Sequence, residues 1–233
     1  MRLVVVTGSL LERDAILREL GSASLARLPP YAATRVAHPG IGTVVVLPAG
    51  PGAAAAATAA AVGANRLSPD LVVSMGLAGA LGDAAAPGSA VLADPIVAAE
   101  VIEGAGSAEA EPDAEPVGAY EAPRPHLELA RARLASEFDV VIGPLLTVAT
   151  PSRDPAQARA RAQRHPGALA EATGGYGAAV AAAAHRVPTL EARAVGYRAG
   201  SSDAEGAGAG AALEALTVLA QTLFARDWAS VSA

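Results

Sequence analysis

The sequence of 233 residues contains no cysteine and no lysine. Without a thiol there can be no disulfide, zinc–thiolate site or cysteine nucleophile. Without lysine there can be no Schiff base and no P-loop lysine. All 17 basic residues are therefore arginines, and 23 acidic residues outnumber them. The resulting net charge of −6 argues against nucleic acid as a partner.

Aromatic residues and long hydrophobic runs are also scarce. Aromatics make up 3% of the chain although hydrophobic residues make up 52%, so the core must consist mainly of Ala, Val and Leu. Such small side chains suit the close packing of helices on a sheet. The apolar run in the N-terminal segment 1–14 is short and is interrupted by a charged residue at position 12, unlike the hydrophobic region of a signal peptide. The alanine-rich segment 53–64 is too short to cross a bilayer. We expect a soluble, cytoplasmic protein that does not bind membranes.

Short β-branched segments alternate with helical segments along the chain. Strands are predicted at 2–6, 43–48, 70–76, 88–101, 139–148 and 189–195, and helices at 10–20, 50–67, 126–137, 154–164, 175–186 and 207–227. Together with the length, this alternation predicts a single α/β domain over residues 1–233, with helices on both faces of a mixed or mostly parallel sheet. Segment 103–125 is rich in Glu, Pro, Gly and Ala and is predicted to form a mobile loop. Ligands of such folds bind beyond the carboxyl ends of the strands.

Two glycine-rich segments are candidate binding elements. GPGAAA (50–55) has the spacing of a dinucleotide-binding turn, but the next predicted strand has Asp70 before it and no acidic residue at its end. Backbone amides at this helix N-terminus could hold a smaller anion or polar group, and a tight turn without a ligand is the alternative. SMGLAGALG (74–82) places three glycines after a predicted strand, where the backbone could approach a flat ligand closely or simply turn.

Few charged side chains have a position that suggests chemistry. Glu12 begins the helix after the first strand, where it could be catalytic or could only complement the helix dipole. The arginine runs at 130–134 and 157–164 are predicted to be solvated helix faces. The four histidines are predicted to be surface residues without a role: His38, His126, His165 and His185.

Five separated segments, in this order, resemble the nucleoside phosphorylase and nucleosidase superfamily: VVVTGSLLERDAILREL, VVSMGLAGALG, GSAVLADPIVAAE, GPLLTVAT and ALAEATGGYGAAVAAAAHRVPTLEARAV. Within it they are most similar to the futalosine hydrolases of the actinobacterial type, over the chain as far as the strand at 189–195. The resemblance implies a three-layer α/β/α sandwich around a twisted mixed sheet and a homo-oligomer, often a dimer. It implies an N-ribosyl hydrolase that releases a purine base, hypoxanthine, from futalosine or a related nucleoside in the alternative menaquinone route. It implies no metal and no organic cofactor.

The resemblance also assigns roles to residues. Glu12 matches the carboxylate that positions and deprotonates the attacking water. The other matches are binding positions: Gly76, Leu77, Ala78 and Gly79 along the base, Gly50 and Gly52 near the ribose, and Thr147 and Thr150 in the segment that lines the base pocket.

Three positions, in two segments, depart from the family pattern. Where AEAMEGFG carries a Met under the sugar and a Glu that binds the ribose hydroxyls, this chain has Thr173 and Gly174. Loss of one preorganised polar contact costs about 10²–10³ in rate. Glu171 is a candidate substitute for the missing carboxylate. Tyr197 stands where the family has an Asp, or in the futalosine branch an Asn; it could hydrogen-bond to the leaving base or fill the pocket.

These departures keep a second hypothesis open, a catalytically weakened or inactive paralogue that binds a nucleoside or a protein partner. Phosphorolysis is a third reaction class within the superfamily. It is disfavoured because no arginine lies near the Gly50–Gly52 loop in the sequence, where a phosphate would have to be held.

Overall fold

The computed structural model describes residues 1–18, 20–100, 118–201, 208–225 and 228. The strands are β1 (Arg2–Thr7), β2 (Ala23–Leu25), β3 (Thr34–His38), β4 (Gly42–Pro48), β5 (Leu71–Ala80), β6 (Ala90–Ala98), β7 (Ala119–Tyr120), β8 (Val140–Thr147), β9 (Ala170–Ala172) and β10 (Thr189–Arg198). The helices are α1 (Leu10–Leu17), α2 (Ala53–Leu67), α4 (Arg124–Leu134), α5 (Pro155–Arg164), α6 (Gly175–Ala184) and α7 (Gly208–Phe224). All of these strands belong to one mixed sheet in the order β10-β6-β8-β9-β5-β1-β4-β3-β2, with β7 paired to β6.

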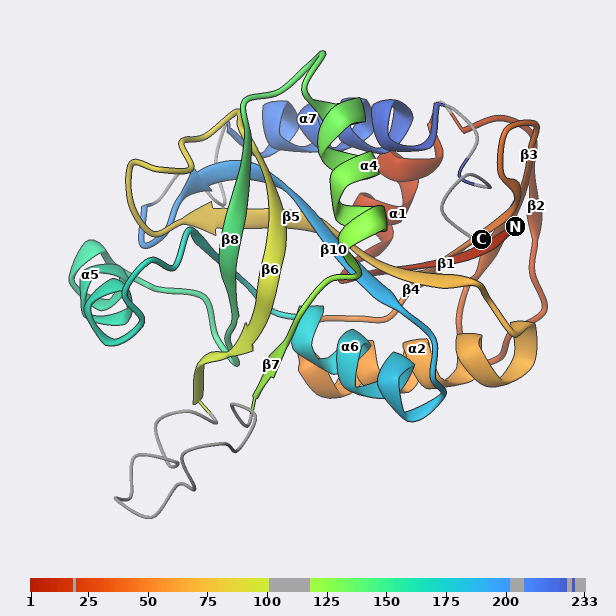
Figure 1. Ribbon diagram of the computed structural model, residues 1–233, viewed down its shortest axis with the longest axis horizontal. Coiled ribbons are helices and arrows are strands. Elements are labelled where there is room, and N and C mark those ends of the chain that lie inside the picture. Colours follow the sequence, from red (N-terminus) through yellow and green to blue (C-terminus); the bar gives the residue numbers. More distant parts are fainter. Residues whose placement is uncertain (19, 101–117, 202–207, 226–227, 229–233) are drawn as a thin grey trace.

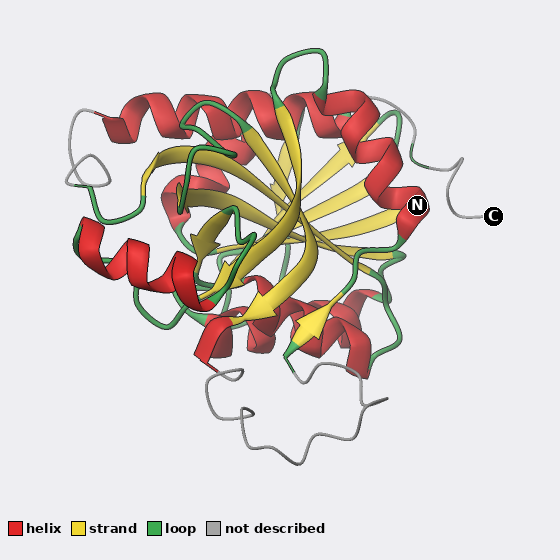
Figure 2. Ribbon diagram, turned by 60° about the vertical axis from the view of Figure 1, so that its left-hand side comes forward, coloured by secondary structure: helices red, strands yellow, loops and turns green. Residues whose placement is uncertain are grey.

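The side chains of β1 show how this sheet divides the core. Leu3 and Val5 pack in the cluster that includes α1, α4 and α7, whereas Val4 and Val6 pack with α2 and α6. Successive side chains of a strand point to opposite faces, so a uniformly apolar strand requires cover on both faces. The two helix layers lie above and below the sheet in Figures 1 and 2. The predicted three-layer arrangement around a twisted mixed sheet is confirmed.

The sheet closes on itself at one end. Strand β10 pairs in parallel with β5 and antiparallel with β6, and β8 and β9 complete the path from β6 back to β5. The β1–β4, β1–β5 and β5–β10 pairs are all parallel. The carboxyl ends of these four strands therefore lie at one edge of the sheet, where a binding site is expected.

Strand β5 is longer than predicted. The sequence predicted that three glycines follow the strand, but the strand continues through Gly76 and Gly79 to Ala80, and of the three only Gly82 follows it. This prediction is wrong because β5 is paired on both sides at its far end: Gly79 is the partner of Tyr197 on β10 and of Glu171 on β9. These tertiary pairings outweigh the low strand propensity of glycine.

Several other predicted boundaries also change. Residues 103–117 of the predicted loop lie outside the described part of the chain, but 118–125 include β7 and the start of α4. His126, predicted at the surface, is buried, and its ring centroid lies 6.1 Å from that of Trp228. The short strands β2, β3 and β9 were not predicted, because segments of three to five residues carry little periodicity of their own.

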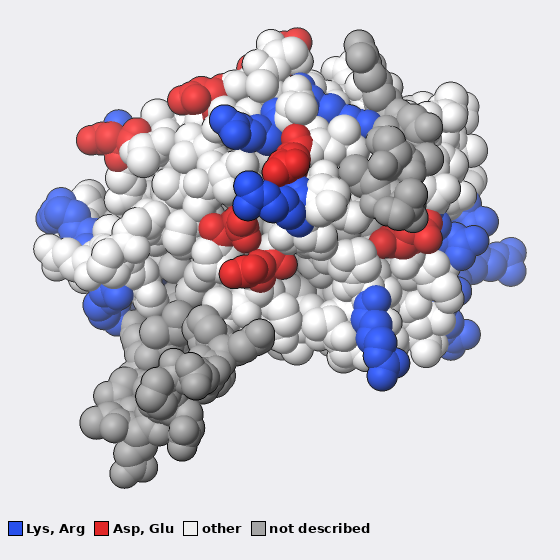
Figure 3. Space-filling model, in the orientation of Figure 1, with Lys and Arg blue, Asp and Glu red and all other residues white. Residues whose placement is uncertain are grey.

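Among the described residues, the face shown in Figure 3 has no large patch of charge of one sign. On the face shown in Figure 3, acidic and basic side chains are scattered among neutral ones. Within the described residues, no helix combines the length and the apolar character that crossing a membrane requires.

Candidate active site

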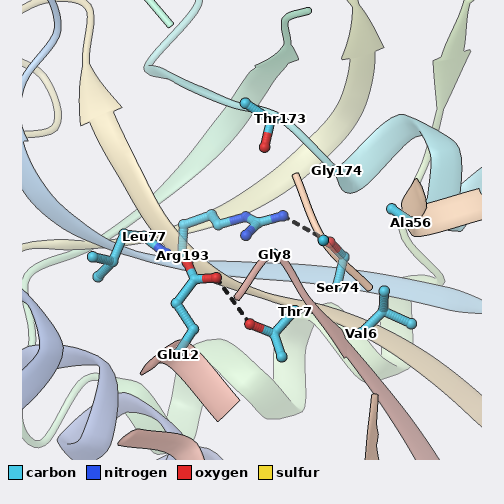
Figure 4. A pocket seen from close by; sticks show the side chains of 11 residues that line it. Val6, Thr7, Gly8, Glu12, Ala56, Ser74, Leu77, Thr173, Gly174 and Arg193 are labelled. Atoms are coloured by element: carbon cyan, nitrogen blue, oxygen red, sulfur yellow. Dashed lines mark hydrogen bonds between the residues drawn. The ribbon is translucent and has the colours of Figure 1, made fainter. Parts of the chain in front are cut away.

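A small cavity lies at the edge of the sheet where β1, β4, β5 and β10 end. Its volume is about 50 Å³, well below the range of about 300–1,000 Å³ that is typical of small-molecule sites. The lining residues come from separate elements of the fold: Val6, Thr7, Gly8, Glu12, Gly50, Ala56, Ser74, Leu77, Thr173, Gly174 and Arg193 (Figure 4). Five residues singled out from the sequence are among them: Glu12, Gly50, Leu77, Thr173 and Gly174.

The carboxylate of Glu12 is held by three donors. Its Oε2 accepts hydrogen bonds from the hydroxyls of Thr7, at 2.9 Å, and Ser9, at 3.3 Å. Its Oε1 accepts the backbone N–H of Leu77 at 2.9 Å. Ser9 also caps α1 by accepting the N–H of Glu12 at 3.1 Å, so the helix end and the carboxylate are fixed together. Glu12 is half-buried, and a carboxylate held in this way can orient and deprotonate a water in the cavity.

Gly76 makes room for two charged side chains. A Cβ at this position would collide with Glu12 Oε1 and would lie 2.6 Å from Arg193 Nη1. The carboxylate and the guanidinium therefore approach the same point above the backbone of β5, one from α1 and the other from β10. A side chain here would displace at least one of them, so glycine is needed for the close approach.

Arg193 is a charged cavity residue that the sequence analysis missed. It is 4% exposed, and its Nη2 donates to Ser74 Oγ at 2.7 Å (Figure 4). Its Nε donates to Glu191 Oε1 at 2.8 Å. One signal was available: Glu191 and Arg193 are charged residues two apart in a strand predicted to be buried, so they share a face and must find polar partners.

Arg193 also changes the argument about phosphorolysis. The sequence shows no arginine near the Gly50 loop, but the fold brings Arg193 to the cavity that Gly50 lines. The sequence-based reason against phosphate is therefore wrong.

Tyr197 lies beside the cavity without lining it. Its ring covers Gly79, where a Cβ would come within 2.6 Å of Tyr197 Cε2. Burial raises the pKa of the Tyr197 phenol, Glu171 and Glu12 raise it further, and Arg193 opposes them. At neutral pH the side chain is therefore a neutral phenol that can donate a hydrogen bond. The ring occupies part of the surface that the resemblance assigns to the base.

Glu171 does not replace the carboxylate that Gly174 lacks. It is buried, and its Oε1 accepts the backbone N–H of Ser152 at 2.6 Å. Its Oε2 accepts the Ser152 hydroxyl and Arg161 Nη1, both at 2.7 Å. Arg161 was predicted on a solvated face of α5. This prediction is wrong, because its guanidinium turns inward to Glu171 and the residue is only 7% exposed.

Other residues matched by the resemblance lie outside the cavity lining. Thr147 accepts the backbone N–H of Tyr176 at 2.8 Å and so supports the first turn of α6. The carbonyl of Thr150 accepts Arg161 Nη2 at 2.9 Å. Ala78 is buried in an apolar cluster, and Gly52 precedes α2 with a φ of 95°. Thr147 and Thr150 therefore support the backbone and side chains around the site and do not line the cavity.

The chain is similar in sequence to proteins of one family. Residues 2–229 match the family described as the phosphorylase superfamily. The futalosine hydrolase of Streptomyces coelicolor is 40% identical over 230 residues, which cover 93% of this chain and 92% of that protein.

Solved nucleosidase structures share the fold. One is a 5′-methylthioadenosine/S-adenosylhomocysteine nucleosidase from Colwellia psychrerythraea in complex with adenine. Its TM-score is 0.81 and its identity 21%, over 96% of this chain and 92% of that chain. Another is the Streptococcus pneumoniae nucleosidase in complex with 8-aminoadenine, with a TM-score of 0.81 and 22% identity over 97% and 98% of the two chains. By family match and sequence identity, this chain belongs to the phosphorylase superfamily, in the family of the S. coelicolor futalosine hydrolase.

Proposed function

We propose that the chain is a nucleosidase that hydrolyses the N-glycosidic bond of a purine nucleoside, futalosine or a close relative, and releases hypoxanthine. The observation that carries the proposal is the Glu12 carboxylate, held by three donors at the cavity wall and adjoined by the Arg193 guanidinium. The relative from S. coelicolor supports the choice of substrate class.

In this reaction, water attacks the anomeric carbon while the bond to the base nitrogen breaks. Glu12 orients the water and takes its proton, and the bonding electron pair leaves with the base. The sugar carries positive charge in the transition state, which a nearby carboxylate stabilises. Arg193 Nη1, which makes no hydrogen bond to a described residue, is available to donate to the water or to a sugar hydroxyl.

Tyr197 is placed to assist the departing base. Because its ring lies over Gly79, we place the base against Leu77 with the phenol at its edge. The raised pKa keeps the proton on the phenol, so Tyr197 donates a hydrogen bond to the base without transferring the proton. The base leaves as an anion and takes its proton from solvent, and Glu12 releases to solvent the proton that it took from the water. This role is weaker than that of a general acid, and we expect slower turnover than an aspartic acid would give.

Three further features of the proposal come from the composition, in the case of the location, and from the resemblance, in the case of the assembly and the pathway. We infer that the protein is cytoplasmic, that it assembles as a homo-oligomer and that the reaction belongs to the alternative menaquinone route. Light scattering coupled to size-exclusion chromatography tests the assembly.

The test of the activity is incubation with a panel of purine nucleosides, futalosine included, followed by chromatography for free base, with and without phosphate. We expect release of hypoxanthine from futalosine without phosphate. Glu12→Gln should abolish release and leave the fold intact. The exposed Glu214 serves as the matched control, and Glu214→Gln should retain wild-type rates.

Three outcomes would count against this assignment. Equal rates for Glu12→Gln and wild type would remove Glu12 from the mechanism. Release that requires phosphate would indicate phosphorolysis. Calorimetric binding of a nucleoside without any release over hours would favour the inactive paralogue.

A further inference from the structure

Behind the cavity wall lies a buried carboxylate that has no part in the mechanism above. Glu191 is 0% exposed, and Arg193 and Ser74 are 4% and 1% exposed. In the parallel pairing of β10 with β5, Glu191 is the register partner of Ser74, and Arg193 is the partner of Gly76. Ser74 and Arg193 line the cavity, whereas Glu191 does not. Glu191 can therefore act on the reaction only through its neighbours.

Glu191 determines which nitrogen of Arg193 faces the cavity. Its Oε1 accepts a hydrogen bond from Arg193 Nε at 2.8 Å and forms an ion pair with Nη2 at 2.8 Å, and Ser74 Oγ accepts a hydrogen bond from Nη2 at 2.7 Å. A guanidinium is planar, so bonds to two of its nitrogens fix its orientation. Nη1 is left pointing to the space above Gly76 that Glu12 shares.

The first residue of α6, Gly175, leaves space for the Glu191 carboxylate. A Cβ on Gly175 would collide with Glu191 Oε2, so only glycine leaves room for it. Oε2 itself is buried and has no hydrogen-bond partner among the described residues, so only one oxygen of the carboxylate is bonded, to Arg193. Such an arrangement is unfavourable for stability and needs another explanation.

Gly174, the residue before α6, also lies close to the Arg193 guanidinium. A Cβ on Gly174 would be 4.0 Å from Arg193 Nη2 and 3.3 Å from Ala56 Cβ, so a side chain at this position could reach Arg193. Gly174 itself has no side chain to pair with Arg193, and the carboxylate that Arg193 binds belongs to Glu191. Without Glu191, the freed guanidinium could turn to Glu12, which approaches the same point, and block the oxygen that binds water.

We propose that Glu191 is a positioning residue for the hydrolysis: it holds Arg193 with Nη1 toward the water and the sugar, and keeps it from pairing with Glu12. The inference rests on the proposed nucleosidase function. In this arrangement β10 supplies the carboxylate that the α6 N-terminus lacks at Gly174.

Kinetics of Glu191→Gln test the proposal. A misplaced guanidinium should lower kcat by about 10²-fold, and KM should change little, because Glu191 does not line the cavity. Adding Gly174→Glu to this variant places a carboxylate near Arg193 again and should recover most of the lost kcat. A purely structural role predicts lower stability with kcat per folded molecule unchanged and no recovery in the double variant.

A second variant tests the contact between Glu191 and Arg193 without replacing Glu191. Gly175→Ala should push the Glu191 side chain off Arg193 and lower kcat in the same way. Gly210→Ala is the matched control, because Gly210 also lies in the first turn of a helix and a Cβ there meets nothing within 4 Å. Wild-type kcat in both Glu191→Gln and Gly175→Ala would overturn the proposal.

A readout that does not depend on activity separates this inference from the proposed function. The Nε–H resonance of Arg193, assigned by its loss in Arg193→Gln, should shift or broaden in Glu191→Gln. An unchanged resonance would show that Glu191 does not hold the guanidinium and would overturn the proposal. If the wild type released no base from any nucleoside, the nucleosidase assignment would fail, and this resonance would still decide whether Glu191 orients Arg193.

Discussion

The ring of Tyr197 lies over Gly79 of the neighbouring strand, so close that a Cβ on Gly79 would come within 2.6 Å of Tyr197 Cε2. The two residues are register partners, directly after a shift in the β10–β5 register between Val195 and Tyr197. The absence of a side chain at Gly79 is what allows the ring to lie there. Tyr197 therefore combines two properties, a hydroxyl that can donate and a ring that fills space, and variants can separate them.

Tyr197→Phe and Tyr197→Asn should affect catalysis differently. Phe keeps the ring and loses the hydroxyl donor. We expect kcat to fall about tenfold, because that is the rate effect of losing one neutral hydrogen bond in the transition state. Asn keeps a donor and removes the ring, so KM should fall as the surface above Gly79 opens. Steady-state kinetics of base release measure both effects. An unchanged kcat in Tyr197→Phe would show that the phenol does not assist the leaving base.

The ionisation of Tyr197 should appear only in strongly alkaline solution. Burial and the carboxylates of Glu171 and Glu12 raise its pKa above the ordinary value of about 10. The folded state therefore holds the phenol proton more tightly than the unfolded state, and this contribution to stability is lost as pH rises through the folded pKa. We expect the unfolding free energy of the wild type, relative to Tyr197→Phe, to be constant at neutral pH and to fall above pH 10. A difference that begins to fall below that pH would contradict the predicted direction.

Gly76→Ala should damage the site without disturbing the core. Its Cβ would collide with Glu12 Oε1 and press on Arg193 Nη1, so one of the two groups must move. A small misplacement of a catalytic group can cost about 10²-fold in rate, and we expect a loss of that order. Gly82→Ala is the control, because a Cβ there meets nothing within 4 Å and should leave kcat unchanged. Equal activity of the two variants would show that the close approach at Gly76 is unimportant.

Glu171→Ala should destabilise the fold. It removes the buried ion-pair partner of Arg161 and leaves only the exposed Glu100, 4.0 Å from Arg161 Nη2; breaking a buried pair in this way costs about 3–5 kcal/mol. The exposed pair of Arg198 and Asp83, at 2.9 Å, provides the comparison. Asp83→Ala should cost about 0–1 kcal/mol. Denaturant unfolding measures both, and equal costs would mean that Glu171 adds nothing beyond a surface interaction.

Some of the site could be predicted from the sequence because it depends on local structure. A serine three residues before Glu12 forms a helix cap that also steadies the carboxylate, and both residues lie within one turn. The alternating strands and helices are local patterns as well, since one turn of helix or two residues of strand suffice to show their period.

Other parts depended on which strands lie next to one another. Nothing near Arg193 in the sequence indicates that its guanidinium will donate a hydrogen bond to Ser74, which lies on another strand 119 positions away. Nor does any local pattern show that Glu171 will pair with Arg161, or that the ring of Tyr197 will lie on Gly79. Strand register is set by long-range pairing, and a slip of one residue would turn each of these side chains to the opposite face.

The sequence by itself determined the layered fold, the family and the acid at the start of the first helix, because these follow from local periodicity, a helix cap and segments that match in order. Only the tertiary structure decided the partners of that acid, the buried Glu191–Arg193 pair and the assignment of Glu171 to the framework. The physical reason is that a charge buried in a sheet must find its counterpart on whichever strand the chain folding places beside it.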